Sequence, residues 1–249
     1  MQHAAQEMQA MVFAAGLGTR LRPLTDTRPK ALVEVRGVTL LLRTLRTLQG
    51  AGARRIVVNV HHYADMIRLY LADNENFGLD IAISDESEHL LDTGGGIRRA
   101  ASLFDASKPV LIHNVDILSN ADLGCLYACI GGDDAALLVS ERPSSRYLLF
   151  DDDMLLVGWT NVETGALRTP YRRLDAQRCR RYAFAGIHVV ARSALDAMQS
   201  WPERFSIIDF YLDVCATMRI RGHLQDGLVL TDVGKIETLE RLNASGPLT

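Results

Sequence analysis

The sequence predicts an α/β fold: a three-layer sandwich with a mainly parallel central sheet and a small antiparallel β excursion. Two patterns lead to this prediction. Up to about residue 140, short apolar runs typical of buried strands alternate with segments whose apolar residues recur every three or four positions, as in helices. Between residues 142 and 181 the apolar runs become shorter and the charges denser, which favours an antiparallel excursion.

Each expected element follows from its own local pattern. The expected strands are rich in aliphatic and β-branched residues and cover 10–15, 55–60, 79–84, 109–113, 135–140, 182–190 and 228–232. The expected helices have 3–4 apolar spacing and cover 40–49, 63–72, 96–104, 122–129, 194–199, 207–218 and 236–242. Three consecutive aspartates at 151–153 indicate a hairpin turn inside the excursion. We expect one domain over residues 1–249, with the excursion at 142–190 as part of it.

The composition excludes several broad classes of protein. A chain of 249 residues with 48% hydrophobic and 23% charged residues is ordinary for a soluble globular domain. The formal net charge of −3 disfavours a general nucleic-acid binder. No apolar stretch approaches the roughly 20 residues that cross a bilayer, and residues 1–9 lack a signal-peptide core. We therefore expect no nucleic-acid partner, no membrane partner and a cytoplasmic location.

The cysteines and histidines show no motif typical of a metal site. The four cysteines form no CxxC pair and are expected to be free thiols: Cys125, Cys129, Cys179 and Cys215. Cys125 and Cys129 are four positions apart in an expected helix, so they share one face. His61 and His62 end a strand, where neighbouring side chains point to opposite faces, so we expect no metal site there.

A long basic loop follows the first strand and is the most informative segment of the chain. Gly16 and Gly18 allow backbone N–H groups to approach a phosphate, and the loop lies where parallel α/β sheets bind ligands. It is not a Walker A loop, and Leu21 replaces the third glycine of a dinucleotide-binding fingerprint. From 16 to 36, five cations and two anions sum to +3; the cations are Arg20, Arg22, Arg28, Lys30 and Arg36. Such a field suits a polyphosphate, although a solvated surface loop is the alternative.

Two aspartates and a glycine run mark the ends of other expected elements. Asp116, in Asn114-Val115-Asp116, and Asp232, in Asp232-Val233-Gly234, each follow a strand, where a carboxylate can bind Mg²⁺ or simply form a turn. The segment 92–96 (DTGGG) precedes an expected helix, where glycines and unbonded helix N–H groups can accept a flat base or act as a linker.

Together these motifs resemble the signature of the sugar-phosphate nucleotidyltransferase (NDP-sugar pyrophosphorylase) family, G-x-G-x-R-L-x-P-L-T followed by P-K. The match here is 16–25 followed by Pro29-Lys30, and the resemblance extends over about residues 10–242. Within the family the chain looks closest to short members that act on N-acetylmuramate 1-phosphate or mannose 1-phosphate. The resemblance implies a Rossmann-like fold of the nucleotide-diphospho-sugar transferase type, and transfer of a nucleotidyl group from a nucleoside triphosphate to a sugar 1-phosphate, forming an NDP-sugar and pyrophosphate.

The resemblance also implies a role for each motif residue. Arg20 and Lys30 would be catalytic, and Asp116 and Asp232 would bind Mg²⁺. Sugar contacts would come from Asp92 and Gly186. Nucleotide contacts would come from Ala14, Ala15, Gly16, Gly18, Thr19, Thr93, Gly94, Gly95 and Asn114.

The base, the sugar and the oligomeric state remain open at this point. The family resemblance favours UTP with an N-acetylated sugar 1-phosphate, with GTP and mannose or heptose 1-phosphate as the alternative. A non-catalytic sugar-nucleotide sensor or regulatory subunit is an alternative of a different class. The chain departs from the family pattern at Val115 and Lys235, and it lacks the acidic motif with a following Lys-Pro of glucose 1-phosphate enzymes. Lys235 contacts a phosphate or begins a solvated helix, and we expect a monomer or a small homo-oligomer.

Overall fold

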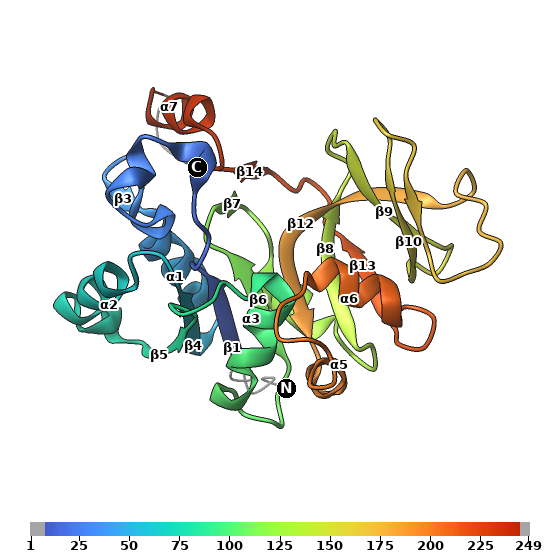
Figure 1. Ribbon diagram of the computed structural model, residues 1–249, viewed down its shortest axis with the longest axis horizontal. Coiled ribbons are helices and arrows are strands. Elements are labelled where there is room, and N and C mark those ends of the chain that lie inside the picture. Colours follow the sequence, from blue (N-terminus) through green and yellow to red (C-terminus); the bar gives the residue numbers. More distant parts are fainter. Residues whose placement is uncertain (1–7, 245–249) are drawn as a thin grey trace, which may run out of the picture.

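The structure is a computed structural model that describes residues 8–244, and a ten-stranded sheet is its central layer (Figure 1). Four strands form the parallel half of the sheet in the order β5-β4-β1-β6. These are β1 (Met8–Phe13), β4 (Ala53–Val60), β5 (Asp80–Asp85) and β6 (Val110–Asn114). This order confirms the predicted α/β class with a mainly parallel N-terminal half.

Helices cover both faces of this sheet. Ala10 and Val12 on β1 pack into the core under one face, whereas Met11 between them packs into the core under the other. On the first face lie α1 (Leu40–Gly50), α2 (Ala64–Asp73), α4 (Leu123–Ala128) and α7 (Ile236–Ala244). On the second lie α3 (Asp92–Ala100), α5 (Arg192–Met198) and α6 (Ile207–Val214). The expected three layers are therefore present.

The long strand β12 (Arg180–Val190) joins the parallel half to the antiparallel half. It pairs antiparallel with β6, with β8 (Ala135–Ser140) and, through its first residues, with β9 (Arg146–Phe150). The strands β9, β10 (Leu156–Asn161) and β11 (Leu167–Arg168) continue the sheet away from α1 and α2 (Figure 1). The β9–β10 hairpin turns at the expected aspartates, where the Asp151 carboxylate accepts the Leu155 N–H at 2.8 Å.

Four described strands outside the excursion were not predicted, and two helices differ from their expected bounds. The strand β13 (Ile220–Leu224) pairs parallel with β8, and the expected helix 207–218 ends at Val214. The strand β7 (Ile117–Ser119) pairs with β14 (Leu230–Asp232) outside the main sheet. The helix expected at 96–104 begins at Asp92, so its three glycines lie inside the helix rather than before it. The short strands β2 (Glu34–Val35) and β3 (Val38–Thr39), which pair with each other, were not predicted either.

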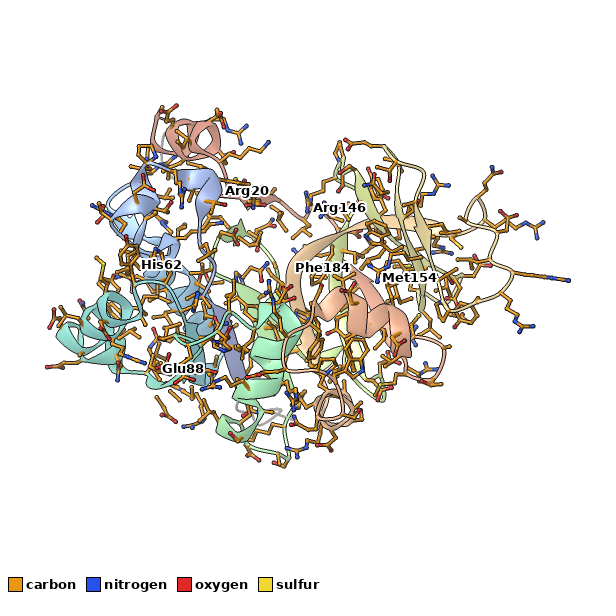
Figure 2. The ribbon with its side chains drawn as sticks, viewed as in Figure 1. Arg20, His62, Glu88, Arg146, Met154 and Phe184 are labelled. Carbon is orange, nitrogen blue, oxygen red and sulfur yellow. The ribbon has the colours of Figure 1, made fainter. Side chains whose placement is uncertain are left out.

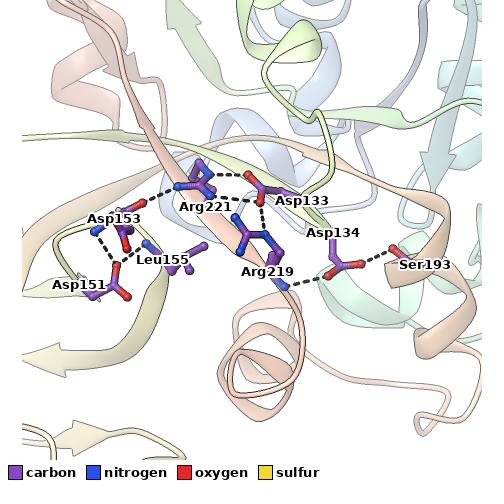
Figure 3. Close-up of polar contacts among 8 residues, drawn as sticks. All are labelled: Asp133, Asp134, Asp151, Asp153, Leu155, Ser193, Arg219 and Arg221. Atoms are coloured by element: carbon purple, nitrogen blue, oxygen red, sulfur yellow. Dashed lines mark hydrogen bonds and ion pairs between the residues drawn. The ribbon is translucent and has the colours of Figure 1, made fainter.

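A buried aspartate ties β13 to the rest of the sheet (Figure 3). Asp133 accepts hydrogen bonds from Arg219, at 2.8 Å, and from Arg221. Arg221 also donates to the Asp153 carbonyl in the hairpin turn. Burial alone would raise the pKa of Asp133, but the two arginines outweigh it, so the pKa is lowered. Between residues 8 and 244, no helix is long and apolar enough to cross a bilayer.

Candidate functional site

A cavity of about 460 Å³ opens at the carboxyl ends of β1 and β6, where parallel α/β sheets usually bind ligands. Most of the predicted site residues line it. These are Ala14, Ala15, Gly16, Gly18, Thr19, Arg20, Lys30, Asp92, Thr93, Asn114 and Asp116. The structure therefore brings the basic loop, the N-x-D triplet and the start of α3 to one place.

The basic loop folds back on itself at Gly18. This residue has a φ of +64°, and a Cβ here would come within 2.9 Å of Thr25 Cγ2 and 3.0 Å of Lys30 Cβ. Its carbonyl accepts hydrogen bonds from the Leu21 N–H, at 2.8 Å, and from the Thr25 hydroxyl, at 2.9 Å. Gly16, by contrast, has open space beside it. Gly18 thus packs the loop against Lys30, while Gly16 leaves the cavity accessible.

Two carboxylates and a lysine meet at one end of the cavity, which Lys30 and Asp116 line, while Asp232 lies just behind the lining, beside Gly234. Lys30 is only 9% exposed, and its ammonium group donates to the Asp116 carboxylate. Asp232 reaches the same place because β14 pairs with β7, which begins directly after Asp116. The Val233 N–H donates to the Asp116 carbonyl at 2.8 Å, which fixes the two segments together.

Asp232 is not fully satisfied by the protein. Its Oδ1 atom is buried and has no hydrogen-bond partner among the described residues. Burial and then the neighbouring Asp116 raise the pKa of Asp232, and the positive charges of Lys30, Arg20 and Arg142 oppose that shift. A buried carboxylate oxygen without a partner, next to a second carboxylate, is the donor set that a hard divalent cation prefers.

Gly234 explains the glycine that follows Asp232-Val233. A Cβ at this position would lie 2.6 Å from Asp232 Oδ1 and 2.9 Å from the Arg20 guanidinium. The absence of a side chain thus lets Arg20 approach the Asp232 carboxylate. The neighbouring Lys235 is exposed, at the start of α7.

Asn59 and Glu86 line the cavity but were not predicted. The Asn59 side chain accepts the N–H groups of Ala14, at 2.7 Å, and Ala15, at 3.2 Å, and it donates to Glu86 at 2.7 Å. Glu86 is 2% exposed, and burial raises its pKa despite that hydrogen bond. The amides of Ala14 and Ala15 are therefore already bonded, which leaves their carbonyls for a ligand. Asn59 lies two residues before the histidine pair. A polar residue near the carboxyl end of the buried strand β4 was therefore the sequence feature that could have indicated its role.

Gly94 and Gly95 are not among the residues that line the cavity. The sequence suggested that unbonded N–H groups at these glycines could accept a flat base, but here the two N–H groups are already bonded. Both N–H groups donate to the Phe205 carbonyl, at 2.9 and 3.2 Å. A Cβ on Gly94 would lie 2.2 Å from the Phe205 ring, and one on Gly95 would lie 2.2 Å from the Glu203 carbonyl oxygen. The segment before α6 packs so closely on α3 that neither position has room for a side chain. Thr93 and Asp92, at the start of the same helix, do face the cavity.

Gly186 lies deeper, behind Asn114. It has a φ of +76°, and a Cβ here would come within 2.7 Å of the Asn114 amide nitrogen. It occupies the register shift where β12 bends between its two sets of partners. Its position supports the orientation of Asn114, and it is not among the residues that line the cavity.

A second pocket, of about 390 Å³, lies on the antiparallel half and carries three arginines. Arg168 is bound to Asp209 at 2.8 Å and lies over the Trp159 ring, whereas Arg146 forms no ion pair within residues 8–244. The third arginine, Arg142, is one of the positive charges that oppose the raised pKa of Asp232, so its charge acts near the first cavity as well. Figure 2 shows Arg20 on the N-terminal half and Arg146 and Phe184 on the half that carries the excursion.

Comparison with known proteins identifies relatives that cover much of the chain. Residues 9–139 match the family model described as nucleotidyl transferase. The chain is 50% identical, over 227 residues, to an N-acetylmuramate alpha-1-phosphate uridylyltransferase of Caulobacter vibrioides, covering 88% of this chain and 89% of that one. It is 32% identical to a mannose-1-phosphate guanyltransferase of Neurospora crassa, over 56% of this chain and 40% of that one. A UDP-glucose pyrophosphorylase structure from Acinetobacter baumanii has the same fold, with a TM-score of 0.76, 16% identity and 96% and 92% coverage.

Proposed function

Because this chain belongs to the nucleotidyl transferase family, we propose that it joins UTP to N-acetylmuramate α-1-phosphate, forming UDP-N-acetylmuramate and pyrophosphate. The observation that carries the proposal is the 50% identity to the Caulobacter uridylyltransferase across 88% of this chain. The match to the mannose-1-phosphate guanyltransferase extends over only 56% of the chain and at lower identity, so GTP with mannose 1-phosphate is the weaker assignment.

The arginine pocket supports an acidic sugar. N-acetylmuramate differs from N-acetylglucosamine by a lactyl ether that carries a carboxylate, and mannose has no such group. Arg142 and Arg146 line the second pocket. The remaining arginine of this pocket, Arg168, is already neutralised by Asp209. Because guanidinium groups bind carboxylates through paired hydrogen bonds, the two arginines suit the lactyl group.

The reaction needs little proton transfer by the protein. A phosphate oxygen of the sugar 1-phosphate attacks the α-phosphorus of the triphosphate, and the bond from that phosphorus to the departing pyrophosphate breaks. The attacking oxygen is already ionised near neutral pH, so no general base is required. Catalysis then depends on alignment and on neutralising charge on the phosphates. Arg20 and Lys30 line the cavity and supply that positive charge.

Asp116 and Asp232 are the residues that would hold Mg²⁺. The buried Oδ1 of Asp232 without a partner among residues 8–244, beside a second carboxylate, fits an oxygen-binding cation. When bound, the cation would neutralise phosphate oxygens and orient the triphosphate. Lys30, which donates to Asp116, would position that carboxylate, and because it lines the cavity it would also add its own charge there.

Pyrophosphate release from purified protein tests the proposal. UTP, GTP, CTP and dTTP would each be paired with the 1-phosphates of N-acetylmuramate, N-acetylglucosamine and mannose, with Mg²⁺ or with a chelator. We expect the highest kcat/KM with UTP and N-acetylmuramate 1-phosphate, and loss of turnover with the chelator. A preference for GTP with mannose 1-phosphate would replace the assignment, and no release from any pair would indicate a non-catalytic sensor.

A further inference from the structure

Cys125, Cys129 and His223 form a compact cluster on the surface, and none of them lines the candidate site. Their thiol sulfurs and imidazole nitrogen lie within 4.8 Å of one another. It is the one cluster of three or more potential metal ligands of this kind within residues 8–244. Both cysteines are exposed, and His223 is partly exposed, so an ion could enter from solvent.

The fold places these three residues together for simple reasons. Cys125 and Cys129 are one helical turn apart, on the side of α4 that its buried residues Leu123 and Leu126 leave free. His223 belongs to β13, which pairs along its length with β8 and meets the excursion on its other side only at the Leu155–Arg221 bridge, so it lies at an edge of the sheet. The helix and the edge strand together present two sulfurs and one nitrogen.

We propose that Cys125, Cys129 and His223 bind one Zn²⁺ ion. Two thiolates and an imidazole are preferred ligands of zinc, whereas Mg²⁺ and Ca²⁺ require oxygen ligands. Zinc–sulfur bonds of about 2.3 Å in tetrahedral geometry separate two sulfurs by about 3.8 Å, within the spacing of this cluster. Binding would release one proton from each thiol, and water would occupy the fourth position.

The ion would fasten the two segments that carry the proposed Mg²⁺ ligands. The helix α4 follows β7 and Asp116, and β13 precedes β14 and Asp232. These segments are already joined by hydrogen bonds: the Val229 N–H donates to Asn120 at 2.7 Å, and the Asp122 N–H donates to Gln225 at 2.7 Å. Zinc at the cluster would add a further connection, and its effect would be on stability rather than on the chemical step.

Cobalt substitution tests the site on the full-length protein. Reduced protein is freed of metal with a chelator and titrated with Co²⁺. We expect one Co²⁺ per chain, with the sulfur-to-cobalt charge-transfer absorption that only thiolate ligands produce. Adding Zn²⁺ should displace the cobalt, raise the thermal midpoint and protect two of the four cysteines from alkylation, located by mass spectrometry.

Matched variants separate this site from other thiols. Cys129→Ser and His223→Ala should each weaken cobalt binding by at least about 100-fold, because the loss of a direct ligand exceeds the 10–100-fold effect of its supporting partners. Cys179→Ser, a cysteine outside the cluster, should bind as the wild type does. A cobalt spectrum without charge-transfer absorption, or one unchanged in Cys129→Ser, would overturn the proposal. So would rapid oxidation of Cys125 and Cys129 to a disulfide in the presence of equimolar Zn²⁺.

Discussion

Asp133, beside β13, and Asp232, at the end of β14, differ in how completely the protein supplies hydrogen-bond partners to their carboxylates. Asp133 receives hydrogen bonds from two arginines, and its pKa is lowered. Asp232 keeps a buried oxygen without a partner among the described residues, and its pKa is raised by burial and by Asp116. The difference supports our proposal that Asp232 is reserved for a ligand, whereas Asp133 holds the fold together.

The largest expected effect is on turnover. Lys30→Ala and Asp116→Asn should each lower kcat by roughly 1,000-fold, because each removes a charge that acts on the phosphates or on their cation. Asp133→Asn makes the same chemical change as Asp116→Asn outside the cavity and should leave the kcat of the folded protein within about twofold. Pyrophosphate release at saturating substrates, with circular dichroism to confirm folding, measures this. Equal losses of kcat in Asp116→Asn and Asp133→Asn would remove the distinction between a carboxylate of the cavity and one that only holds the fold together.

The next largest effect is on the free energy of unfolding, and here we expect the change at Asp133 to matter. Asp133→Ala leaves Arg219 and Arg221 without their partner, so we expect a loss of about 2–3 kcal/mol in the free energy of unfolding. Asp196→Ala removes an exposed i,i+4 ion pair with Arg192 and should cost at most about 0.5 kcal/mol. Urea unfolding followed by fluorescence compares the two. If Asp133→Ala cost no more than Asp196→Ala, the Asp133 network would not stabilise the sheet.

The part of the fold and site that the sequence predicts is the part with local causes. The buried strands, the basic loop and both strand-end aspartates follow from runs of neighbouring residues, and the structure brings Lys30, Asp116 and Asp232 together. The β14–β7 pairing that does so was not predictable, because β7 is only three residues long. The strand β13 was missed for a related reason: Arg221 and Gly222 interrupt its apolar pattern, and its pairing with β8 compensates.

The features of the site that the sequence does not reveal arise from contacts between distant segments. Gly94 and Gly95 resemble a ligand loop in sequence, but the structure uses them to admit Phe205 and Glu203. Asn59 was missed because its importance depends on accepting two amides from β1's end, more than forty residues away in the chain. A run of glycines indicates that another group packs closely against the backbone, but the sequence does not show whether that group is a ligand or another segment of the protein.

The arginines of the second pocket differ in the same way, because one has an ion-pair partner and another has none. Arg168 is bound to Asp209, whereas Arg146 forms no ion pair among residues 8–244. Arg146→Gln should raise the KM for N-acetylmuramate 1-phosphate about tenfold, the effect of losing one charge-assisted contact. The KM for N-acetylglucosamine 1-phosphate, which lacks the carboxylate, should change little. An equal rise for both sugars would mean that Arg146 binds a group that they share.

The smallest effect is the most diagnostic, because its sign differs between the two aspartates. Asp232→Asn removes a half-buried charge beside Asp116, so the chelator-treated protein should gain about 1 kcal/mol of unfolding free energy while losing turnover. A raised folded-state pKa means that the folded protein binds more protons than the unfolded chain between the two pKa values. The unfolding free energy of the wild type therefore falls as pH rises through that window. The difference in unfolding free energy in favour of Asp232→Asn grows over the same pH range.

Asp133 should behave in the opposite way, since its folded-state pKa is lowered and its stabilisation is lost as pH falls through that pKa. Urea unfolding in the presence of a chelator, at mildly acidic and at neutral pH, compares the wild type with Asp232→Asn and Asp133→Asn. The advantage of Asp232→Asn should shrink on acidification, because protonation already neutralises the wild-type carboxyl group. If Asp232→Asn were instead destabilising at both pH values, the Asp232 carboxylate would be holding the fold together as Asp133 does, and the case for a reserved ligand site would fail.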